Sequence, residues 1–167
     1  SELGFDGDGD NDRFLRECMF GGPFDSRQSR ERHFFNEQHA VYKAVAGIAD
    51  LLKRRVELRR RRQYLRQISA NSENSGYPHL LGGQMCSIVP WSRLFDDREL
   101  LLAINTDPDD GLTAWVTTDD SLHRAGDKLT CIYATDSALI GQTVNVEARN
   151  SKAVRITVPG AGFVVYQ

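Results

Sequence analysis

The spacing of the hydrophobic residues changes along the chain, and the first part has the spacing of a helix. Apolar residues recur there at intervals of four, three and four residues, at Val41, Val45, Ile48 and Leu52. This periodicity places them on one face of a helix. With Asn36 as the N-cap, the pattern predicts an amphipathic helix over residues 37–57. Residues 13–20 predict a shorter helix, which ends at Gly21-Gly22-Pro23.

After residue 86 the apolar residues gather in short β-rich runs separated by turn sequences. The runs lie at 87–91, 99–105, 112–118, 128–134, 143–148, 153–158 and 163–167. The turns are Asp96-Asp97, 108–111, 125–127 and 159–162. Such closely spaced strands predict an antiparallel sandwich or barrel, and residues 64–68 predict one more strand. We therefore expect an α+β chain with two domains, a loop and helix segment at 1–57 and an all-β sandwich at 58–167.

Composition narrows the classes of protein that remain. The chain has 167 residues, of which 40% are hydrophobic, and this is too apolar for global disorder. No apolar run is long enough to span a bilayer, so no membrane partner is expected. No signal peptide is visible and Ser1 is not an initiator Met, so we expect a piece excised from a longer protein and favour a cytoplasmic location.

The net charge of −2 conceals a basic segment between two acidic ones. Residues 36–69 carry nine Lys or Arg and three Asp or Glu. A surplus of this kind can bind a polyanion through Arg54–Arg66, but pairing with the acidic flanks is the simpler interpretation. We therefore expect no nucleic-acid partner.

One acidic loop has the spacing of a calcium site. Asp6, Asp8, Asp10 and Asp12 fall at positions 1, 3, 5 and 7 of a twelve-residue calcium loop, and Glu17 falls at position 12. The alternative is an acidic loop that pairs with nearby arginines. Calcium is the only cofactor that the sequence suggests.

The other reactive side chains form no recognisable catalytic set. The four histidines are scattered without ligand spacing, and no Gly-x-Ser-x-Gly elbow is present. The cysteines at 18, 86 and 131 are far apart, so buried free thiols are expected. No catalytic residue is therefore predicted. Trp91 and Trp115 could stack on sugar rings, although IVPW and TAWV are core-like contexts, so core packing is the favoured interpretation.

Four stretches of the chain resemble one enzyme family. FDGDGDNDRFLRECMFGGPFDS, HFFNEQHAVYKAVAGIADLLKRRVELRRRRQYLRQIS, SIVPWSRLF and AINTD are similar to the C-terminal portion of α-amylase-family glycoside hydrolases. The resemblance implies that the predicted long helix is the last barrel helix. It also implies that the sandwich is an antiparallel, Greek-key domain C.

The resemblance also implies where the chemistry lies. The family's nucleophilic Asp, acid/base Glu and stabilising Asp lie on earlier barrel strands, and no segment of this chain matches them. We therefore expect a non-catalytic fragment, inactive alone, of a parent enzyme that acts on α-glucans. The helix stripe would pack against the parent's barrel, and could otherwise form a homodimer. A free-standing carbohydrate-binding module with an α-glucan ligand is the alternative.

Overall fold

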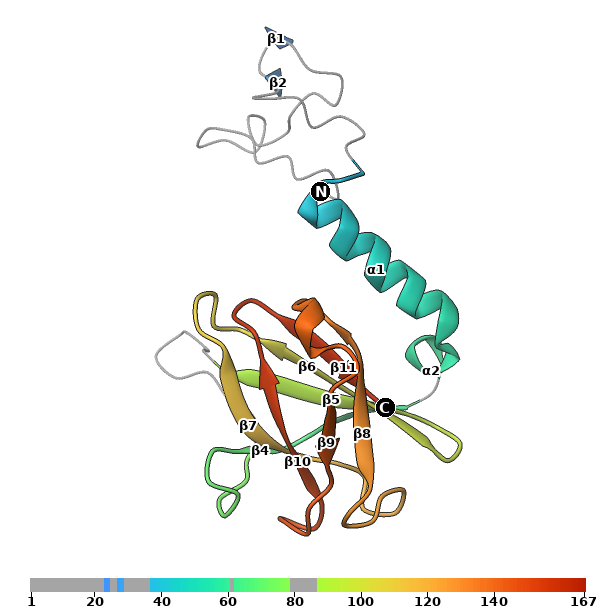
Figure 1. The fold of residues 1–167 in the computed structure, drawn as a ribbon, viewed down its shortest axis with the longest axis vertical. Helices are drawn as coiled ribbons and strands as arrows, with labels where there is room; N and C mark the ends of the chain where they lie inside the picture. Colours follow the sequence, from blue (N-terminus) through green and yellow to red (C-terminus); the bar gives the residue numbers. More distant parts are fainter. Residues whose placement is uncertain (1–22, 25–26, 29–36, 61, 79–86) are drawn as a thin grey trace. The chain divides into compact units, whose positions relative to one another are not determined.

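The computed structural model describes residues 23–24, 27–28, 37–60, 62–78 and 87–167 (Figure 1). The chain divides into two compact units, Ser1–Arg54 and Arg55–Gln167. The domain boundary predicted after residue 57 stays a prediction.

The described residues of the first unit form a small hairpin and a long helix. Strand β1 (Pro23–Phe24) pairs with β2 (Arg27–Gln28), and helix α1 spans Ala40–Arg54. The predicted N-cap, Asn36, lies outside the described residues, whereas the ring Nδ1 of His39 accepts a hydrogen bond from the N–H of Val41 at 3.3 Å. The four residues of the predicted stripe are exposed by 38–48%. Their packing against a protein surface therefore remains a prediction.

The predicted helix is shorter than residues 37–57 because its last turns are interrupted. Arg55 has extended backbone angles, φ −116° and ψ 99°, and separates α1 from the short helix α2 (Val56–Arg59). Arg60 is extended again and leads into the first strand of the second unit.

The second unit is built from two antiparallel sheets (Figure 1). The six-stranded sheet has the order β3 (Arg62–Leu65), β5 (Ile88–Phe95), β6 (Arg98–Asn105), β11 (Phe163–Tyr166), β8 (Lys128–Ala134) and β9 (Thr143–Asn145). The three-stranded sheet has the order β10 (Ala153–Val158), β7 (Leu112–Thr117) and β4 (Ile68–Ser69). A short 3-10 turn, η1 (Ser137–Leu139), follows β8.

The single strand predicted over residues 64–68 is two strands in different sheets. Between β3 and β4 the chain crosses from the six-stranded to the three-stranded sheet at Arg66 and Gln67. Proline in a sheet is normally confined to an edge strand or a bulge, yet Pro90 lies on β5, which has a neighbouring strand on each side. The carbonyl of Pro90 accepts the N–H of Arg66 at 3.1 Å, so the ring nitrogen faces the side on which β3 has already ended. The one bond that Pro90 cannot donate therefore falls opposite Arg66, beyond the last residue of β3.

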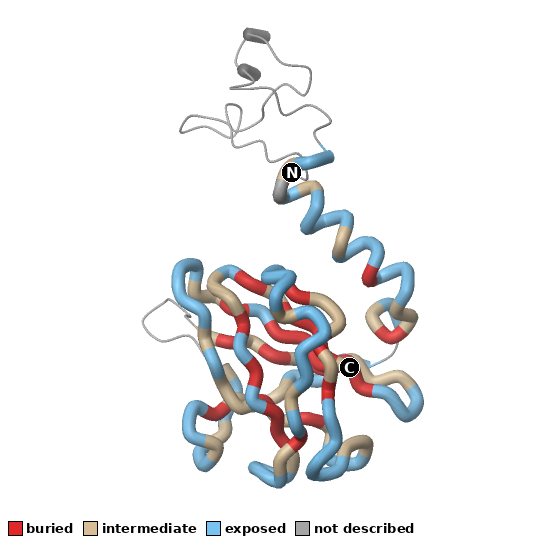
Figure 2. The backbone as a smooth tube through the Cα atoms, viewed as in Figure 1, coloured by how far each residue is buried: buried red, intermediate tan, exposed pale blue. Residues whose placement is uncertain are grey.

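A continuous core joins the facing sides of the two sheets. Side chains from both sheets form it, including Leu101, Val116, Val154 and Val164, each with no exposed surface. Figure 2 shows buried positions along the strands and exposed positions in most of the connecting loops. The last strand, β11, lies between β6 and β8, and the short connection at residues 159–162 leads to it from β10 of the other sheet. The predicted fold, a helix followed by an antiparallel sandwich, is confirmed.

None of the helices described in the structure has the length and apolarity needed to cross a membrane.

Candidate functional site

The outer face of the six-stranded sheet carries a row of apolar residues. Cross-strand partners lie on the same face of a sheet, so the observed register aligns one residue from each of five neighbouring strands. The row consists of Leu65, Trp91, Leu102, Val165 and Tyr133. The core-facing row beside it contains Leu101 and Tyr166, which confirms that the first row points away from the core.

A second apolar row lies next to the first on the same outer face. It consists of Val89, Ile104 and Phe163, which are cross-strand partners. The ring of Phe163 stacks on Trp91 with 6.0 Å between centroids and 16° between planes. Its centroid is 5.7 Å from that of Tyr133. We call these eight residues the apolar face.

The apolar face is only partly covered. Leu102 and Val165, in the middle of the row, are buried, whereas Leu65 is 59% exposed and Ile104 is 37% exposed. An antiparallel sheet that faces water on one side normally alternates apolar and polar residues. This sheet is apolar on both sides, a pattern typical of a layer that packs between two others.

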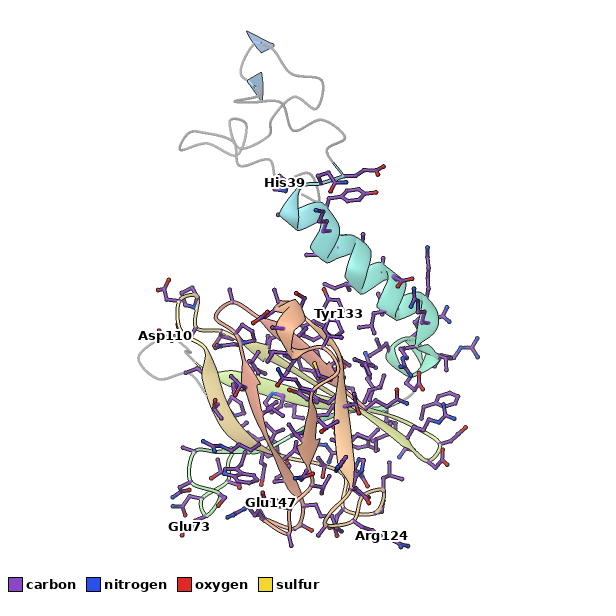
Figure 3. The ribbon with its side chains drawn as sticks, viewed as in Figure 1. His39, Glu73, Asp110, Arg124, Tyr133 and Glu147 are labelled. Atoms are coloured by element: carbon purple, nitrogen blue, oxygen red, sulfur yellow. The ribbon has the colours of Figure 1, made fainter. Side chains whose placement is uncertain are left out.

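The outer face of the three-stranded sheet is different. Val116 of β7 points into the core, and its neighbour Trp115 therefore points outward. The guanidinium of Arg149 lies over the Trp115 ring at 4.5 Å from the centroid. Arg149 is held there by Glu147 and by the hydroxyl of Ser72, each at 2.7 Å. Figure 3 shows Glu147 and Glu73 at one end of the sandwich and Asp110 at the other.

The two tryptophans that the sequence analysis considered for sugar binding thus lie on opposite outer faces of the sandwich. They do not form one groove, and each ring already has a neighbour stacked on it, Phe163 or Arg149. The favoured interpretation, that both pack in the core, is wrong. The sequence context suggested core packing because successive side chains of a strand point to opposite faces, so Trp91 and Trp115 each lie between two residues that do face the core. Sugar binding at either ring stays a prediction.

A buried carboxylate, Glu99, collects polar side chains from several segments. Its side chain has no exposed surface. One oxygen, Oε1, accepts hydrogen bonds from the Ser92 hydroxyl and from Arg66 Nη2, the latter at 2.6 Å. The other, Oε2, accepts from the backbone N–H of Asp119 at 2.9 Å and bonds His123 Nε2 at 2.8 Å. We call these five residues the Glu99 cluster.

The cluster keeps both carboxyl groups ionised. Burial by itself raises the pKa of Glu99. The hydrogen bond from His123 and the charge of Arg66 lower it, as do the hydrogen bonds from the Asp119 N–H and the Ser92 hydroxyl, and together they outweigh the effect of burial. The pKa of Glu99 therefore lies below its ordinary value. Burial also opposes ionisation of Asp119, whose pKa is nevertheless lowered by two hydrogen bonds from Ser121 and by Arg66. Because an ionised carboxylate only accepts, His123 donates its Nε2–H to Glu99.

The Glu99 cluster ties together two connections that cross between the sheets. Arg66 lies in the β3–β4 connection, whereas Asp119 and His123 lie in the β7–β8 connection. Arg66 joins them directly, since its Nη2 is 3.4 Å from Asp119 and its Nε donates to Ser92 at 2.7 Å. This arrangement is no catalytic triad, because the buried Ser92 hydroxyl bonds a carboxylate instead of an imidazole. Its geometry is that of a structural clamp.

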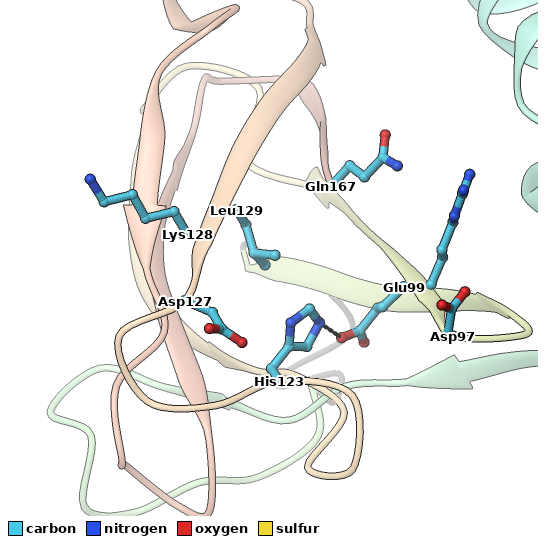
Figure 4. A pocket seen from close by; sticks show the side chains of 8 residues that line it. Asp97, Glu99, His123, Asp127, Lys128, Leu129 and Gln167 are labelled. Carbon is cyan, nitrogen blue, oxygen red and sulfur yellow. Dashed lines mark hydrogen bonds and ion pairs between the residues drawn. The ribbon is translucent and has the colours of Figure 1, made fainter.

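A shallow pocket of about 350 Å³ opens beside the cluster (Figure 4). Glu99 and His123 form part of its wall, and Leu129 supplies an apolar side chain. The remaining lining residues are Asp97, Arg98, Asp127, Lys128 and Gln167. The sequence pointed to none of these as a site. A Glu at the start of the apolar run ELLLAIN was the one available signal of a buried charge.

The predicted calcium ligands, Asp6, Asp8, Asp10, Asp12 and Glu17, lie outside the described residues, so calcium binding stays a prediction. Within the described ranges no group of three or more Cys, His, Asp or Glu could hold a metal ion. Cys131 is buried as expected, and its thiol donates to the carbonyl of Tyr133 at 3.3 Å. Burial raises the pKa of this thiol.

Comparison with known proteins finds structures with a similar fold but no similar sequence family. No family model matches the sequence, and no curated protein matches it. The debranching enzyme of Nostoc punctiforme superposes on 83% of this chain with a TM-score of 0.50 and 16% identity. CldA, a cyclomaltodextrin glucanotransferase with a three-domain ABC distribution, superposes on 86% with a TM-score of 0.52 and 16% identity. The maltogenic α-amylase AmyB of Thermotoga neapolitana superposes on 85% with a TM-score of 0.51 and 10% identity.

These likenesses concern the fold. The chain has the fold of part of an α-amylase-type enzyme. It spans 24% of the debranching enzyme, 24% of the glucanotransferase and 30% of the amylase. The resemblance predicted from the sequence is thus confirmed at the level of the fold, for a domain that makes up about a quarter of such enzymes.

Proposed function

We propose that this chain is the non-catalytic C-terminal part of an α-amylase-type glycoside hydrolase, and that it stabilises the catalytic barrel of that enzyme. The observation that carries the proposal is the apolar face. Trp91, Phe163 and Ile104 are partly exposed on a sheet whose other side already forms the sandwich core. Covering such a face with protein gains about 25 cal/mol for each Å² removed from water.

The partner is proposed from the length of the similar enzymes. The matched region is 24–30% of each enzyme, so the matched domain belongs to a larger body in each of them. The resemblance of the sequence to the α-amylase family implies that this larger body is a barrel and that the barrel carries the catalytic carboxylates. The Glu99 cluster supports a structural role for this chain, because four protein donors from other segments bond its carboxylate.

A barrel encoded upstream of Ser1 provides the test. The barrel would be purified alone and mixed with this chain, and its unfolding midpoint would be measured. We expect the wild-type chain to raise the midpoint and Trp91→Asp to abolish the increase. Trp115→Asp is the matched control on the opposite sheet and should act as the wild type does.

Three outcomes contradict the proposal. They are the absence of an encoded barrel, an equal effect of the two variants, and turnover of starch by the purified chain. Binding of maltodextrin to the chain, detected by tryptophan fluorescence and lost in Trp115→Asp, would instead support the carbohydrate-binding module.

A further inference from the structure

The six-stranded sheet carries carboxylates at one of its ends. Three connections meet there, joined by backbone hydrogen bonds of 2.9 Å from Asn105 to Gly162 and from Thr135 to Phe163. They are residues 106–111, 135–142 and 159–162. These connections contain no Lys or Arg, and their acidic residues are Asp107, Asp109, Asp110 and Asp136. We call these four residues the acidic end.

The opposite end of the sheet is basic. Helix α2 lies against β5 (Figure 1), and its buried Glu57 is 4.0 Å from Arg98 at the start of β6. Besides Glu57, the described residues between 55 and 62 carry four arginines, Arg55, Arg59, Arg60 and Arg62. We call these four arginines the basic end. Within the part of the chain that the structure describes, no carboxylate forms an ion pair with any of them.

The other charges beside the basic end leave its surplus in place. The nearby pocket adds two carboxylates and two cations, which offset one another, namely Asp97, Arg98, Asp127 and Lys128. Glu57 offsets one of the four arginines. The two ends of one sheet therefore carry opposite charge, and an eight-residue strand such as β6 separates them by about 27 Å.

The apolar face lies between these two ends. Arg98 and Leu100 lie on the outer face of β6, because alternation groups them with Leu102. Leu100 has no exposed surface although it is not part of the sandwich core, and α2 bonds the neighbouring Arg98, so α2 lies on this outer side. At the other end, Ile104 and its partner Phe163 border the acidic end.

We propose that the apolar face and its two charged ends form one docking surface with a fixed direction, and that the barrel covering it is acidic opposite the basic end and basic opposite the acidic end. This inference rests on the proposed function. Burial of apolar surface is non-directional, so the apolar face alone does not select one orientation of a partner along the strands. Complementary charges at the rim of an interface fix its register and disfavour the reversed orientation.

Charge reversal at each end tests the direction of the surface. Arg59→Glu and Asp109→Lys would each be made in the full-length enzyme and in this chain alone, and unfolding midpoints would be measured in 10 mM salt. Both positions are exposed. Each reversal should lower the midpoint of the full-length enzyme by about 2 °C more than that of the chain alone. In 150 mM salt this excess should shrink, because the Debye length falls from about 30 Å to about 8 Å.

Two reversals on other surfaces are the matched controls. Arg155→Glu makes the same change as Arg59→Glu on the outer face of the three-stranded sheet, at an exposed position. Glu73→Lys changes an acidic residue to lysine, as Asp109→Lys does, in the exposed β4–β7 connection. Neither control should shift the full-length enzyme more than the chain alone.

The signs of the two shifts decide the inference. A barrel surface of one sign of charge would be destabilised by one reversal and stabilised by the other, and that result overturns the inference. Equal shifts in the full-length enzyme and in the chain alone also overturn it. If a variant fails to fold, the wild-type pair decides, because the difference between the midpoints of the full-length enzyme and the chain alone should decrease between 10 mM and 150 mM salt, and a constant difference overturns the inference.

Trp91→Asp separates this inference from the proposed function. If it costs the full-length enzyme no more than the chain alone, the docking itself is wrong and the inference is wrong with it. If Trp91→Asp shows the excess and the two charge reversals do not, the apolar face docks without a preferred direction. The proposed function then stands, and the inference of complementary charged ends is wrong.

Discussion

The two outer faces of the sandwich are built by the same strand geometry and carry opposite chemistry. Along the three-stranded sheet, Thr113 and Thr157 share a hydrogen bond at 2.8 Å between their hydroxyls, and Arg149 covers Trp115. Along the six-stranded sheet, the corresponding positions form the apolar face. The alternation of side chains along each strand thus determines which residues point outward. The chemistry of those outward side chains determines whether water or another apolar surface can cover them.

This difference indicates which side of the domain is chemically suited to contact with water. Hydroxyl pairs and an arginine over an indole tolerate solvent, because their polar atoms remain hydrated. A face of aromatic and branched side chains does not gain from hydration, and it is stabilised only when another surface excludes water. The contrast is therefore the structural basis of the proposed docking function.

The largest difference between the faces is expected from the truncation of one outward-facing side chain on each sheet. Leu102→Ala removes a buried side chain from the apolar face and should lower the free energy of unfolding by about 2–4 kcal/mol. Thr157→Ala, at an exposed position of the other face, should change it by no more than about 0.5 kcal/mol. Urea unfolding of the two variants measures both. Equal costs would mean that the two faces are energetically alike.

Much of the sandwich could be predicted from the sequence because its strands are short and regularly spaced. The runs at 128–134 and 153–158 coincide with β8 and β10. The segment at 64–68 was predicted wrongly, because a change of sheet at Arg66 leaves no mark in the hydrophobic pattern. The same limit applies to the apolar face, whose rows depend on registers between strands that are distant in sequence.

The Glu99 cluster could not be predicted for a related reason. Its members come from four segments, and Arg66 and Asp119 are 53 residues apart. His123 was interpreted as one of four scattered histidines, since spacing along the chain detects only sites built within one element. A buried charge becomes visible when the tertiary structure shows which partners compensate it.

A smaller difference is expected between the two tryptophans. Trp91→Ala removes a half-buried ring that stacks on Phe163, and it should cost about 2 kcal/mol. Trp115→Ala removes a ring covered by one cation, and it should cost about 1 kcal/mol. Thermal unfolding at neutral pH compares the two. A greater cost for Trp115 would contradict the interpretation that Trp91 is the better packed of the two rings.

The smallest effect concerns the cation that covers Trp115. Arg149→Gln removes the cation–π contact, which is worth about 0.5–1 kcal/mol at an exposed position, so the free energy of unfolding should fall by about that amount. The more informative measurement is quenching of Trp115 fluorescence by acrylamide, made in a Trp91→Phe background so that one indole reports. Loss of the guanidinium uncovers one side of the ring, and quenching should therefore increase.

Arg155→Gln is the matched control for that experiment. Arg155 is the cross-strand partner of Trp115 on the same outer face, but the stacked guanidinium belongs to Arg149. Loss of Arg155 should therefore leave quenching unchanged, although it removes the same charge. If both variants increase quenching equally, general electrostatics and not the specific stacking of Arg149 protects the ring. The outer face of the three-stranded sheet would then tolerate water because of its net charge. Its contrast with the apolar face would come from the residue types present and not from the position of Arg149 over Trp115.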